Sequence, residues 1–551
     1  MEEVTQLRKK VMTMSTKENL TKKAQDAQLV FEQLVTRYGI NPVPTNFIAD
    51  PSKKELFENY SASNMLFSGP VGENLTGKRD DGIAKLFQEE KILQSAGIAG
   101  VLAASSSVAS EIAALRGADI SKAETYCDLA FAGMQAIRLF VADTTGKEFE
   151  KVRLGSAISV NNAFNGIFFK YKTADNRDFS YHVYYQSQQV NLAKALGTKK
   201  PSAEYNTLTI PEDIAELTEI TKKHNSAELE ELSFDCGACG SIVRSREEWE
   251  ATEVGKAVCA QPLIHEVKYG EGEKPNWGMP NELGPLSGIK VLDLTHIIAG
   301  PACSRVLSQY GADVLLVRRG KFIEQEQAMT ELDGWAGKHS IQLDFKNPDE
   351  LARAKELVKE ADVIVYSYQN GAMDKFGLSE DDIRELNPNI IYANLNCFSE
   401  TVWRHRPGWA PCAEDMTGLA VRNGTMEKPV NLNGVPLDYF PGFILGLGTL
   451  LAIKHRLENG GGYKVTTSLT RGAQYLHEIT DLCEDPNTPA PTLSKVIDHH
   501  DDPTWMNVTD AIADVATGGE ILFPGPATVN TAFPRNMKNL AFSDGNTGWR
   551  Q

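Results

Sequence analysis

The sequence predicts an α/β fold: a Rossmann-like parallel sheet with helices on both faces, plus a smaller α+β domain. Between residues 289 and 395, short apolar runs alternate with helical segments, which is typical of parallel strands buried on both faces. Residues 164–260 combine a β-hairpin pattern with charged helical segments. Residues 267–287 are rich in Pro and Gly, so they are the best candidate for a linker between the two parts.

The overall composition indicates a soluble globular protein with more than one domain. The chain has 551 residues, a formal net charge of −17, 42% apolar residues and eight cysteines. Its length exceeds the size at which one core usually stops growing. An excess of acids argues against nucleic-acid binding, and no apolar run approaches the ~20 residues that span a bilayer. Few cysteines and the lack of a signal-peptide pattern predict a cytoplasmic protein that binds neither nucleic acid nor membrane.

The first half of the chain divides into a helical segment and the smaller domain. Residues 1–150 are expected to be mainly helical, with a loop at 41–80 and an Ala-, Ser- and Val-rich helix centre at 96–115. Residues 151–280 form the predicted α+β domain, which opens with a hairpin whose turn is formed by residues 173–176. Small residues at this density in the first segment suit close helix packing.

The Rossmann-like domain is predicted over residues 285–475. Its apolar strands are expected at 289–294, 312–317, 361–366 and 389–395, with helices between them. Ligands bind at the carboxyl ends of the strands in such sheets. The apolar run at 439–453 is interpreted as a buried helix, and the tail at 476–551 as loops with one short helix near 507–515.

Several motifs in this domain resemble CoA-transferase family III, the CaiB/BaiF type that includes formyl-CoA transferases and α-methylacyl-CoA racemases. The motifs follow the family's order and spacing. They are LSGIKVLDL at 286–294, IAGP at 298–301, GADV at 311–314, GKHSIQLD at 337–344, GL at 377–378, LNPNIIY at 386–392, RPGW at 406–409 and TGL at 417–419. Together they make the resemblance specific for about a third of the chain.

The first half is faintly similar to the same family, but its blocks are out of order. YKTADNR at 171–177 resembles the hairpin that opens the family's small domain, and SREEW at 245–249 resembles a later helix. In a single-copy member these blocks follow the nucleotide-fold domain, whereas here they precede it. We infer an internal duplication with loss, in which the first copy has a degraded start and the second a truncated end.

The resemblance implies chemistry on a CoA thioester, and this chemistry needs a carboxylate. In the transferases an Asp attacks the thioester, and the reaction passes through a mixed anhydride and an aspartyl-CoA thioester. In the racemases an acid/base pair removes and returns the α-proton. Both uses place that Asp directly after the family's RPGY motif, where this chain has Ala410. A methyl group can be neither nucleophile nor base.

Three hypotheses address the missing carboxylate. Glu414 or Asp415, about one helical turn further on, could face the same cleft, although a solvated helix face would explain them as well. The other half of the chain, or a partner chain, could supply the acid. Alternatively, the site could bind acyl-CoA without transferring it. Asp438 is most simply the N-cap of the following helix, but it could also be a substitute acid near the cleft.

The turn after the first strand is the first expected contact with CoA. His296 stands where the family often has Arg, so it could approach the thioester or the phosphates, or it could be a structural histidine at a strand end. Gly300 and Pro301 shape a turn that brings backbone N–H groups and a helix N-terminus near an anion.

The remaining CoA contacts implied by the resemblance are basic. Arg318, Arg319 and Lys338 sit where the family places basic residues against the CoA phosphates, although solvent-exposed charge is the alternative. Gln369 replaces an Arg of the family, and this replacement weakens phosphate binding.

No metal site is expected. Cys236 and Cys239 form a C-x-x-C without a second ligand pair, so structural thiols are the better interpretation. The acidic and His-rich run at 498–502 is interpreted as a polar turn. Cys412 lies near the expected active site, but its motif offers no evident His partner except His405.

The sequence therefore predicts an acyl-CoA transferase that moves CoA between carboxylic acids, with a racemase or a catalytically silent CoA-binding protein as alternatives. Its partners would be an acyl-CoA, as substrate rather than permanent cofactor, and a carboxylic acid. Because members of the family form interlocked dimers, we expect a homodimer or a single chain that mimics one.

Overall fold

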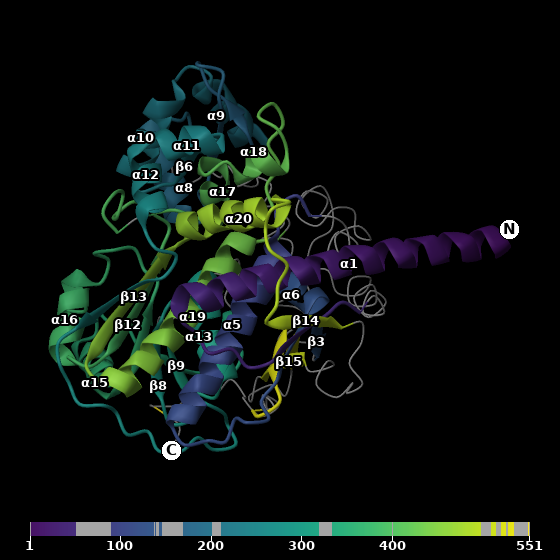
Figure 1. Cartoon of the computed structure of the whole chain (residues 1–551). Helices are drawn as coiled ribbons and strands as arrows, with labels where there is room; N and C mark the ends of the chain where they lie inside the picture. The colour runs from purple at the N-terminus through teal and green to yellow at the C-terminus, as the bar shows by residue number, and fades with distance from the viewer. Residues whose placement is uncertain are drawn as a thin grey trace.

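The computed structural model describes most of the chain. The described residues are 2–50, 90–136, 138, 143–145, 169–200, 211–318, 333–398, 400–432, 434–497, 509–513, 520–524, 527–533 and 549. They form three regions: a large parallel sheet with its helices, a small α+β domain, and a layer of helices and short strands from the N-terminal part of the chain (Figure 1).

The largest sheet has seven strands in the order β10-β9-β8-β11-β12-β13-β7. Its strands are β7 (His265–Tyr269), β8 (Lys290–Leu294), β9 (Asp313–Arg318), β10 (His339–Gln342), β11 (Val363–Tyr366), β12 (Ile391–Asn396) and β13 (Gly462–Ser468). All neighbouring pairs are parallel except β13 and β7. In register, Val291 of β8 lies opposite Val314 of β9 and Val363 of β11. The strand order therefore reverses between β8 and β11, the place where doubly wound sheets bind their ligands.

Helices cover both faces of this sheet, as the sequence predicted. The helices of this part of the chain are α13 (Ala299–Gln309), η3 (Asp333–Trp335), α15 (Pro348–Glu360), η4 (Asp374–Phe376), α16 (Glu380–Leu386), α17 (Ala410–Met416), α18 (Leu419–Asn423), α19 (Pro436–Asn459) and α20 (Leu469–Glu484), of which α17 and α18 lie beside the small domain. Val291 and Val363 point into one apolar core. Leu292 and Ile364, one residue further along each strand, point into a second core on the other face.

Local signals in the sequence set the ends of these helices. α15 begins at Pro348 because the side chain of Asn347 accepts a hydrogen bond from the N–H of Asp349, and Pro is tolerated at the first helical position. Asp349 and Glu350 in its first turn and Lys359 in its last turn complement the helix dipole.

Over its described residues, the small domain combines a three-stranded sheet with five helices. The strands are β4 (Tyr171–Lys172), β5 (Asp178–Tyr181) and β6 (Gly240–Ile242), and the helices are α8 (Gln186–Leu196), α9 (Pro211–Thr221), α10 (Ser226–Asp235), α11 (Arg246–Ala251) and α12 (Glu253–Ala260). β4 and β5 are antiparallel, which confirms the predicted hairpin, and its turn residue Asn176 has a φ of 59°. Asn tolerates this left-handed conformation better than most residues.

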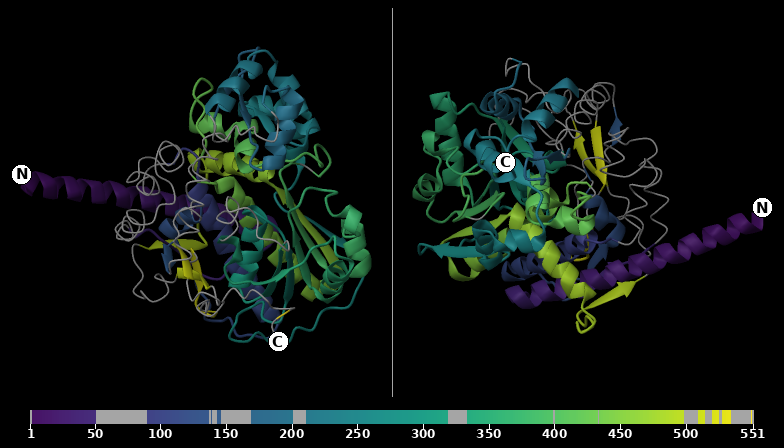
Figure 2. Two further views of the ribbon diagram at one scale, coloured as in Figure 1. Left: turned by 180° about the vertical axis from the view of Figure 1, so that it is seen from behind. Right: turned by 90° about the horizontal axis from the view of Figure 1, so that it is seen from above.

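The N-terminal part packs against the large sheet's helices. It consists of α1 (Glu2–Tyr38), β1 (Thr45–Ile48), α5 (Gln94–Leu115), β2 (Thr125–Asp128), α6 (Leu129–Gln135) and β3 (Asp143–Thr145). α1 runs beside α5, and its N-terminal end projects away from the rest of the molecule (Figures 1 and 2). α5, β2 and α6 repeat the helix–strand–helix order of α19, β13 and α20.

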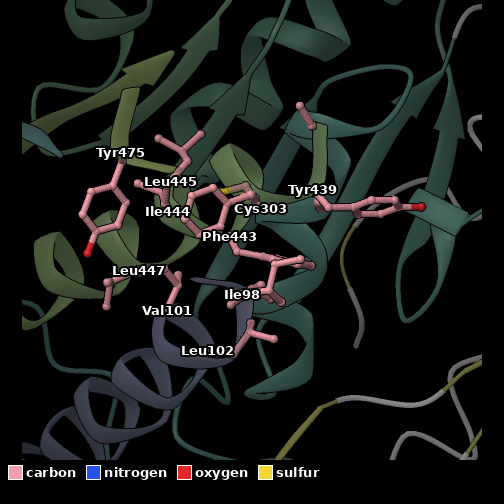
Figure 3. Packing of buried hydrophobic residues seen from close by; sticks show 14 of the residues in the cluster. Ile98, Val101, Leu102, Cys303, Tyr439, Phe443, Ile444, Leu445, Leu447 and Tyr475 are labelled. Atoms are coloured by element: carbon pink, nitrogen blue, oxygen red, sulfur yellow. The ribbon is translucent and has the colours of Figure 1, made fainter. Parts of the chain in front are cut away.

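α5 and α19 form the centre of the largest core. Figure 3 shows Val101 and Leu102 of α5 beside Phe443 and Leu447 of α19. Burying each such side chain contributes roughly 1.5–3 kcal/mol. Among the described residues, these two helices have the length and composition of membrane spans, but 89% and 94% of their most apolar windows are buried inside the molecule. Both are therefore core helices, in agreement with the expected burial of residues 439–453.

Three local predictions were wrong. Residues 45–48, expected in a loop, form β1, which pairs in parallel with β2 and with β14 (Ser494–Ile497) in a four-stranded sheet completed by β17 (Thr528–Asn530). β7 occupies the start of the expected linker as an antiparallel edge strand. The short helix expected near 507–515 is instead β15 (Thr509–Ala513), which pairs with β16 (Glu520–Pro524). Each error falls on a short strand whose pairing partner lies far away in the sequence.

Candidate functional site

A cleft lies at the carboxyl ends of β8, β11 and β12, beside the reversal in strand order. Its volume is about 320 Å³. Six stretches of the large domain line it, and α8 of the small domain closes one side. The lining segments are His296–Gly300, Ser367–Asn370, Leu395–Cys397, Arg404 with 406–409, Asp438 with Leu469, and the small-domain residues Tyr185, Ser187, Gln188 and Gly237. The two domains therefore build the cleft together.

The turn between β8 and α13 forms the floor of the cleft. Ile297 has a φ of 66°, a left-handed conformation that a β-branched residue rarely adopts, so the surrounding fold must stabilise this strained turn. α13 then starts at Ala299 without a side-chain cap and without an acid in its first turn. Its first two residues, Ala299 and Gly300, line the cleft, where the uncapped N–H groups of a helix start favour an anion.

Gly300 allows this turn to approach its neighbours closely. A Cβ atom at this position would lie 2.6 Å from Oγ of Ser367 and 2.7 Å from Cβ of Thr295. A larger residue would therefore push the start of α13 away from the end of β11. The predicted role of Gly300 in shaping the turn agrees with this geometry, whereas Pro301 lies behind the cleft, within the first turn of the helix.

Aromatic rings make up much of the cleft wall. The ring of His296 stacks on Tyr368, with centroids 4.6 Å apart and planes 18° apart. Across the domain boundary, the ring centroids of Tyr185 and Trp409 lie 5.4 Å apart. The indole Nε1 of Trp409 and Oδ1 of Asn396 are buried without a hydrogen-bond partner among the described residues. Such polar atoms beside a cleft are available to a bound molecule.

Two arginines at the cleft differ in their partners. Arg406 pairs with Glu231 of the small domain at 2.5 Å and lies over the rings of Phe234 and Trp403. Arg404 is exposed, and its guanidinium makes no hydrogen bond or ion pair with the described residues. Arg406 therefore holds the two domains together, while Arg404 remains available for a soluble anion.

Asp415 does not reach the cleft; it fastens the small domain to α17. It is fully buried, and its carboxylate lies 2.6 Å from Nζ of Lys170 and 3.5 Å from Nε2 of His182. Ser241 donates a further hydrogen bond of 3.4 Å. Burial alone would raise the pKa of Asp415, but Lys170 and His182 outweigh it and hold the pKa well below its usual range. The predicted catalytic role of Asp415 is therefore corrected to a structural one.

Glu414 is also buried outside the cleft. Its Oε2 atom accepts hydrogen bonds from the N–H of Leu432 at 2.9 Å and from Nδ2 of Asn431 at 2.8 Å. Burial raises its pKa to about 8, despite these hydrogen bonds, so the side chain is a neutral acid near pH 7. Its predicted catalytic role is likewise corrected: Glu414 anchors the segment that leads into α19. Neither acid lies on the solvated helix face that was the alternative.

Asp438 is the acid that does line the cleft. The N-cap of α19 is Val435, so the interpretation of Asp438 as a cap was wrong; the residue lies within the first turn. The side chain is partly exposed to the cleft. Its carboxyl makes no hydrogen bond or ion pair with the described residues, and burial raises its pKa to about 7.

The predicted basic contacts with CoA are mostly absent from the cleft. Lys338 is fully buried, where Nζ lies 2.7 Å from Asp293 and 2.7 Å from Oγ of Ser304. It supports α13 from behind, so its predicted phosphate contact was wrong. Arg318 ends β9 and lies over the ring of Trp335, 4.9 Å from its centroid, away from the cleft-lining residues. Arg319 falls outside the described residues.

Three other predicted residues have clear positions. His296 and Gln369 line the cleft, and Nε2 of Gln369 donates a hydrogen bond to the carbonyl of His405. Cys412 is buried in α17 and does not line the cleft. Among the described residues, no group of three or more His, Cys, Asp or Glu side chains is placed to hold a metal ion.

Ala410, the position where the resemblance implies the catalytic Asp, is the first residue of α17 and is only 1% exposed. Cys397, at the end of β12, lines the cleft nearby and packs so closely on Gly408 that a Cβ there would collide with its Sγ. Burial raises the pKa of the Cys397 thiol well above its usual range, so it stays protonated.

Sequence reasoning missed Arg404, Asn396, Trp409 and Cys397 as cleft residues. The position of Asn396 and Cys397 directly after the predicted strand at 389–395 was a usable signal, because strand ends face the ligand in this fold. Tyr185 and Gln188 carried no such signal, since they approach the cleft only through the packing of the small domain.

Comparison with known proteins shows which proteins this part of the chain is similar to. Residues 286–503 match the profile of CoA-transferase family III. An acyl-CoA transferase of Gibberella moniliformis is 28% identical over 305 residues, covering 53% of this chain and 52% of the relative. An acetyl-coenzyme A transferase of Hypoxylon pulicicidum is 27% identical over 406 residues, covering 68% of this chain and 66% of the relative.

Part of the chain is also similar to a solved structure. The crystal structure of a CaiB/BaiF family protein from Brucella suis is 23% identical, with a TM-score of 0.32, over 43% of this chain and 65% of its own. The chain thus spans between about half and two thirds of the length of these relatives.

Proposed function

Residues 286–503 match CoA-transferase family III, and on that premise we propose that the cleft binds an acyl-CoA and exchanges CoA between two carboxylic acids. The observation that carries this proposal is the composition of the cleft at the strand reversal. Among the described residues, it combines an open helix N-terminus, an arginine without an ion-pair partner, and one partly exposed carboxyl.

These three features suit the three parts of an acyl-CoA substrate. The exposed Arg404 at the cleft wall suits the phosphates of CoA, because a guanidinium binds phosphate oxygens through paired hydrogen bonds. The N–H groups at the start of α13 suit the thioester oxygen, on which negative charge develops during attack. Asp438 is suited to act at the reacting carbon, because it lines the cleft and can therefore reach the substrate.

Racemisation at the α-carbon of an acyl-CoA is the second candidate. It needs an acid and a base on opposite sides of the α-carbon. His296 and Asp438 both line the cleft, and we assign this role to them. The presence of two such groups favours this candidate over a silent protein, whose cleft would need neither.

The test uses the full-length chain with isotopes that separate the reactions. The protein is incubated with acetyl-CoA, succinyl-CoA or 2-methylacyl-CoA and a panel of carbon-14-labelled carboxylic acids, in light or heavy water. CoA transfer moves the carbon label into the acyl-CoA pool. Deuterium at the α-carbon without carbon label would instead indicate racemisation. Binding of CoA with neither change would contradict both enzymatic functions.

A further inference from the structure

The turn between β8 and α13 is held in a strained conformation. Ile297 has a left-handed φ of 66°, and α13 begins at Ala299 without a side-chain cap. A strained turn of this kind persists only where several surrounding contacts over-determine its conformation. A buried ion pair behind the turn, between Asp293 of β8 and Lys338, supplies such contacts.

The carboxylate of Asp293 binds the chain on both sides of the turn. Its Oδ1 atom accepts a hydrogen bond from Oγ1 of Thr295, which lies at the start of the turn. Its Oδ2 atom accepts a hydrogen bond of 2.5 Å from Oγ of Ser304, which lies in the second turn of α13. One buried side chain therefore fixes the end of β8 relative to the helix that follows.

The ammonium group of Lys338 ties the first turn of α13 to the same carboxylate. Nζ lies 2.7 Å from Oδ2 of Asp293, 2.7 Å from Oγ of Ser304 and 3.0 Å from the carbonyl oxygen of Pro301. An ammonium has three N–H donors, and these three acceptors use all of them. Because Pro301 lies in the first turn of α13, the position of that turn depends directly on Lys338.

The stability of the core alone does not call for charges at these two positions. Both side chains are fully buried, and apolar residues of similar volume often stabilise a core as well as a buried ion pair does. What the charges add is direction, since charge-assisted hydrogen bonds are short and depend on geometry. The pair therefore sets where the start of α13 lies, more than whether the core forms.

We propose that Asp293 and Lys338 form a positioning pair, which holds the turn and the start of α13 where the helix N–H groups can bind the thioester oxygen. Ala299 and Gly300, the first two residues of α13, line the cleft, whereas neither member of the pair does. The pair acts through the helix, without touching the substrate. This inference rests on the proposed function and adds to it the residues that place its oxyanion-binding groups.

The test uses a double variant, because removal of one partner alone would leave the other charge buried and unpaired. Asp293→Asn together with Lys338→Met removes both charges and keeps side chains of similar size. The matched control, Glu111→Gln together with Lys454→Met, removes a second buried ion pair, whose nitrogen and oxygen lie 2.6 Å apart between α5 and α19. Neither control residue lines the cleft. Ser304→Ala, which removes one contact of the network, is a milder third variant, and urea denaturation shows which variants fold.

Steady-state transfer between an acyl-CoA and a carbon-14-labelled carboxylic acid separates positioning from support of the fold. We expect kcat of the Asp293/Lys338 variant to fall about 10²- to 10³-fold, as for the loss of an oxyanion donor, with KM changed less than about threefold. Ser304→Ala should lower kcat about fivefold, the effect of one hydrogen bond. The Glu111/Lys454 control should keep kcat within about twofold of wild type.

Two kinetic outcomes would overturn the inference. One is a folded Asp293/Lys338 variant whose kcat stays within about threefold of wild type, and the other is an equal loss of kcat in the Glu111/Lys454 control. If the Asp293/Lys338 variant does not fold, an unchanged kcat in Ser304→Ala overturns the inference instead.

Hydrogen exchange of the full-length proteins measures how firmly the turn is held without relying on activity. Peptides that cover residues 293–304 should exchange about tenfold faster or more in the Asp293/Lys338 variant than in wild type, while the control matches wild type. Unchanged exchange contradicts a positioning role. A wild-type protein that transfers no CoA refutes the proposed function and this inference with it. Transfer by wild type, with unchanged kcat and exchange in the variant, refutes this inference alone.

Discussion

The helices α17 and α19 pack against each other, but the acids of α17 and the acid of α19 have opposite surroundings. Asp415 is surrounded by Lys170, His182 and Ser241, and Glu414 by Asn431 and the backbone of Leu432. Asp438 has none of these partners and is open to the cleft. The difference shows that the availability of a carboxylate, rather than its distance in sequence from a motif, indicates which acid can react.

The basic residues show the same contrast. Lys338 is paired with Asp293 in the interior, and Arg406 is paired with Glu231 at the domain boundary. Arg404 lies at the cleft without an acidic partner among the described residues. In both sets, the paired groups hold the fold together, and the unpaired group faces the space where a ligand would bind.

Replacing Asp438 is the most direct test of the contrast between the acids of α17 and the acid of α19. We expect Asp438→Asn to lower turnover by a factor of about 10⁴ or more, because the reacting group itself is lost. Thermal unfolding should be unchanged or shifted slightly upward, since the carboxyl has no hydrogen bond to the part of the chain that the structure describes. Steady-state transfer rates together with circular dichroism check both expectations, and residual turnover above about a tenth of wild type would contradict them.

Replacing Asp415, the paired acid, should instead lower the free energy of unfolding. Asp415→Asn leaves Lys170 charged at the domain junction without its counterion, which should cost about 3–5 kcal/mol of unfolding free energy. Glu414→Gln, by contrast, replaces a neutral acid by a neutral amide and should cost less than about 1 kcal/mol. Urea denaturation of the wild-type protein and of these two variants measures the differences in unfolding free energy. Equal stability of the two variants would show that the buried ion pair has no structural role.

The pH dependence of the transfer rate tests whether Asp438 takes part in the reaction. Transfer requires the ionised form of Asp438, whose pKa is about 7, so the rate should rise as the pH increases through 7 and level off above it. Below pH 6, each further unit should reduce the rate about tenfold. A rate that is constant from pH 5 to 8 would indicate an acid with an ordinary pKa.

The stability effect of this raised pKa has the opposite sign to that of a salt-bridged acid. The folded chain holds the Asp438 proton more tightly than the unfolded chain, whose Asp pKa is near 4. Folding is therefore progressively disfavoured as the pH rises from about 4 through 7. The loss of stability should disappear in Asp438→Asn. The raised pKa would be contradicted if the wild type and this variant differed in unfolding free energy by the same amount at every pH.

The smallest expected effect concerns the unpaired arginine. Arg404→Gln should weaken CoA binding about tenfold, the loss expected for one charge-assisted contact, and leave the fold unchanged. Arg353→Gln, on the outer surface of α15, is the matched control, because its surface ion pair with Glu360 contributes little. If both variants bind CoA alike, Arg404 has no part in the site.

Much of the fold was predictable from sequence because its strands carry their own signal. The predicted runs at 289–294, 312–317, 361–366 and 389–395 contain β8, β9, β11 and β12 to within a residue or two, since near-continuous apolar stretches are needed for burial on both faces. Short edge strands such as β7 do not require a continuous apolar stretch. They form by pairing with residues that are distant in sequence, and a local sequence pattern does not indicate that pairing.

The site was less predictable than the fold. His296, Gly300 and Gln369 follow strand ends and do line the cleft, as position in the sheet implied. Glu414 and Asp415 were chosen for their distance from a motif, but the direction in which a side chain points from a short helix depends on what packs against it. Here Lys170 and His182, more than two hundred residues away in sequence, decide the position of Asp415. No pattern within one chain segment contains that information.

Calorimetric titration of the full-length protein with CoA tests the central claim, which is that the strand-end cleft accepts a CoA thioester. A non-hydrolysable thioether analogue of acetyl-CoA serves as the second ligand. We expect one binding site per chain for both ligands, with about tenfold weaker affinity in Arg404→Gln and unchanged affinity in Arg353→Gln. The absence of binding heat and of competition between the two ligands, or an affinity unaffected by Arg404→Gln, would contradict the assignment of this cleft.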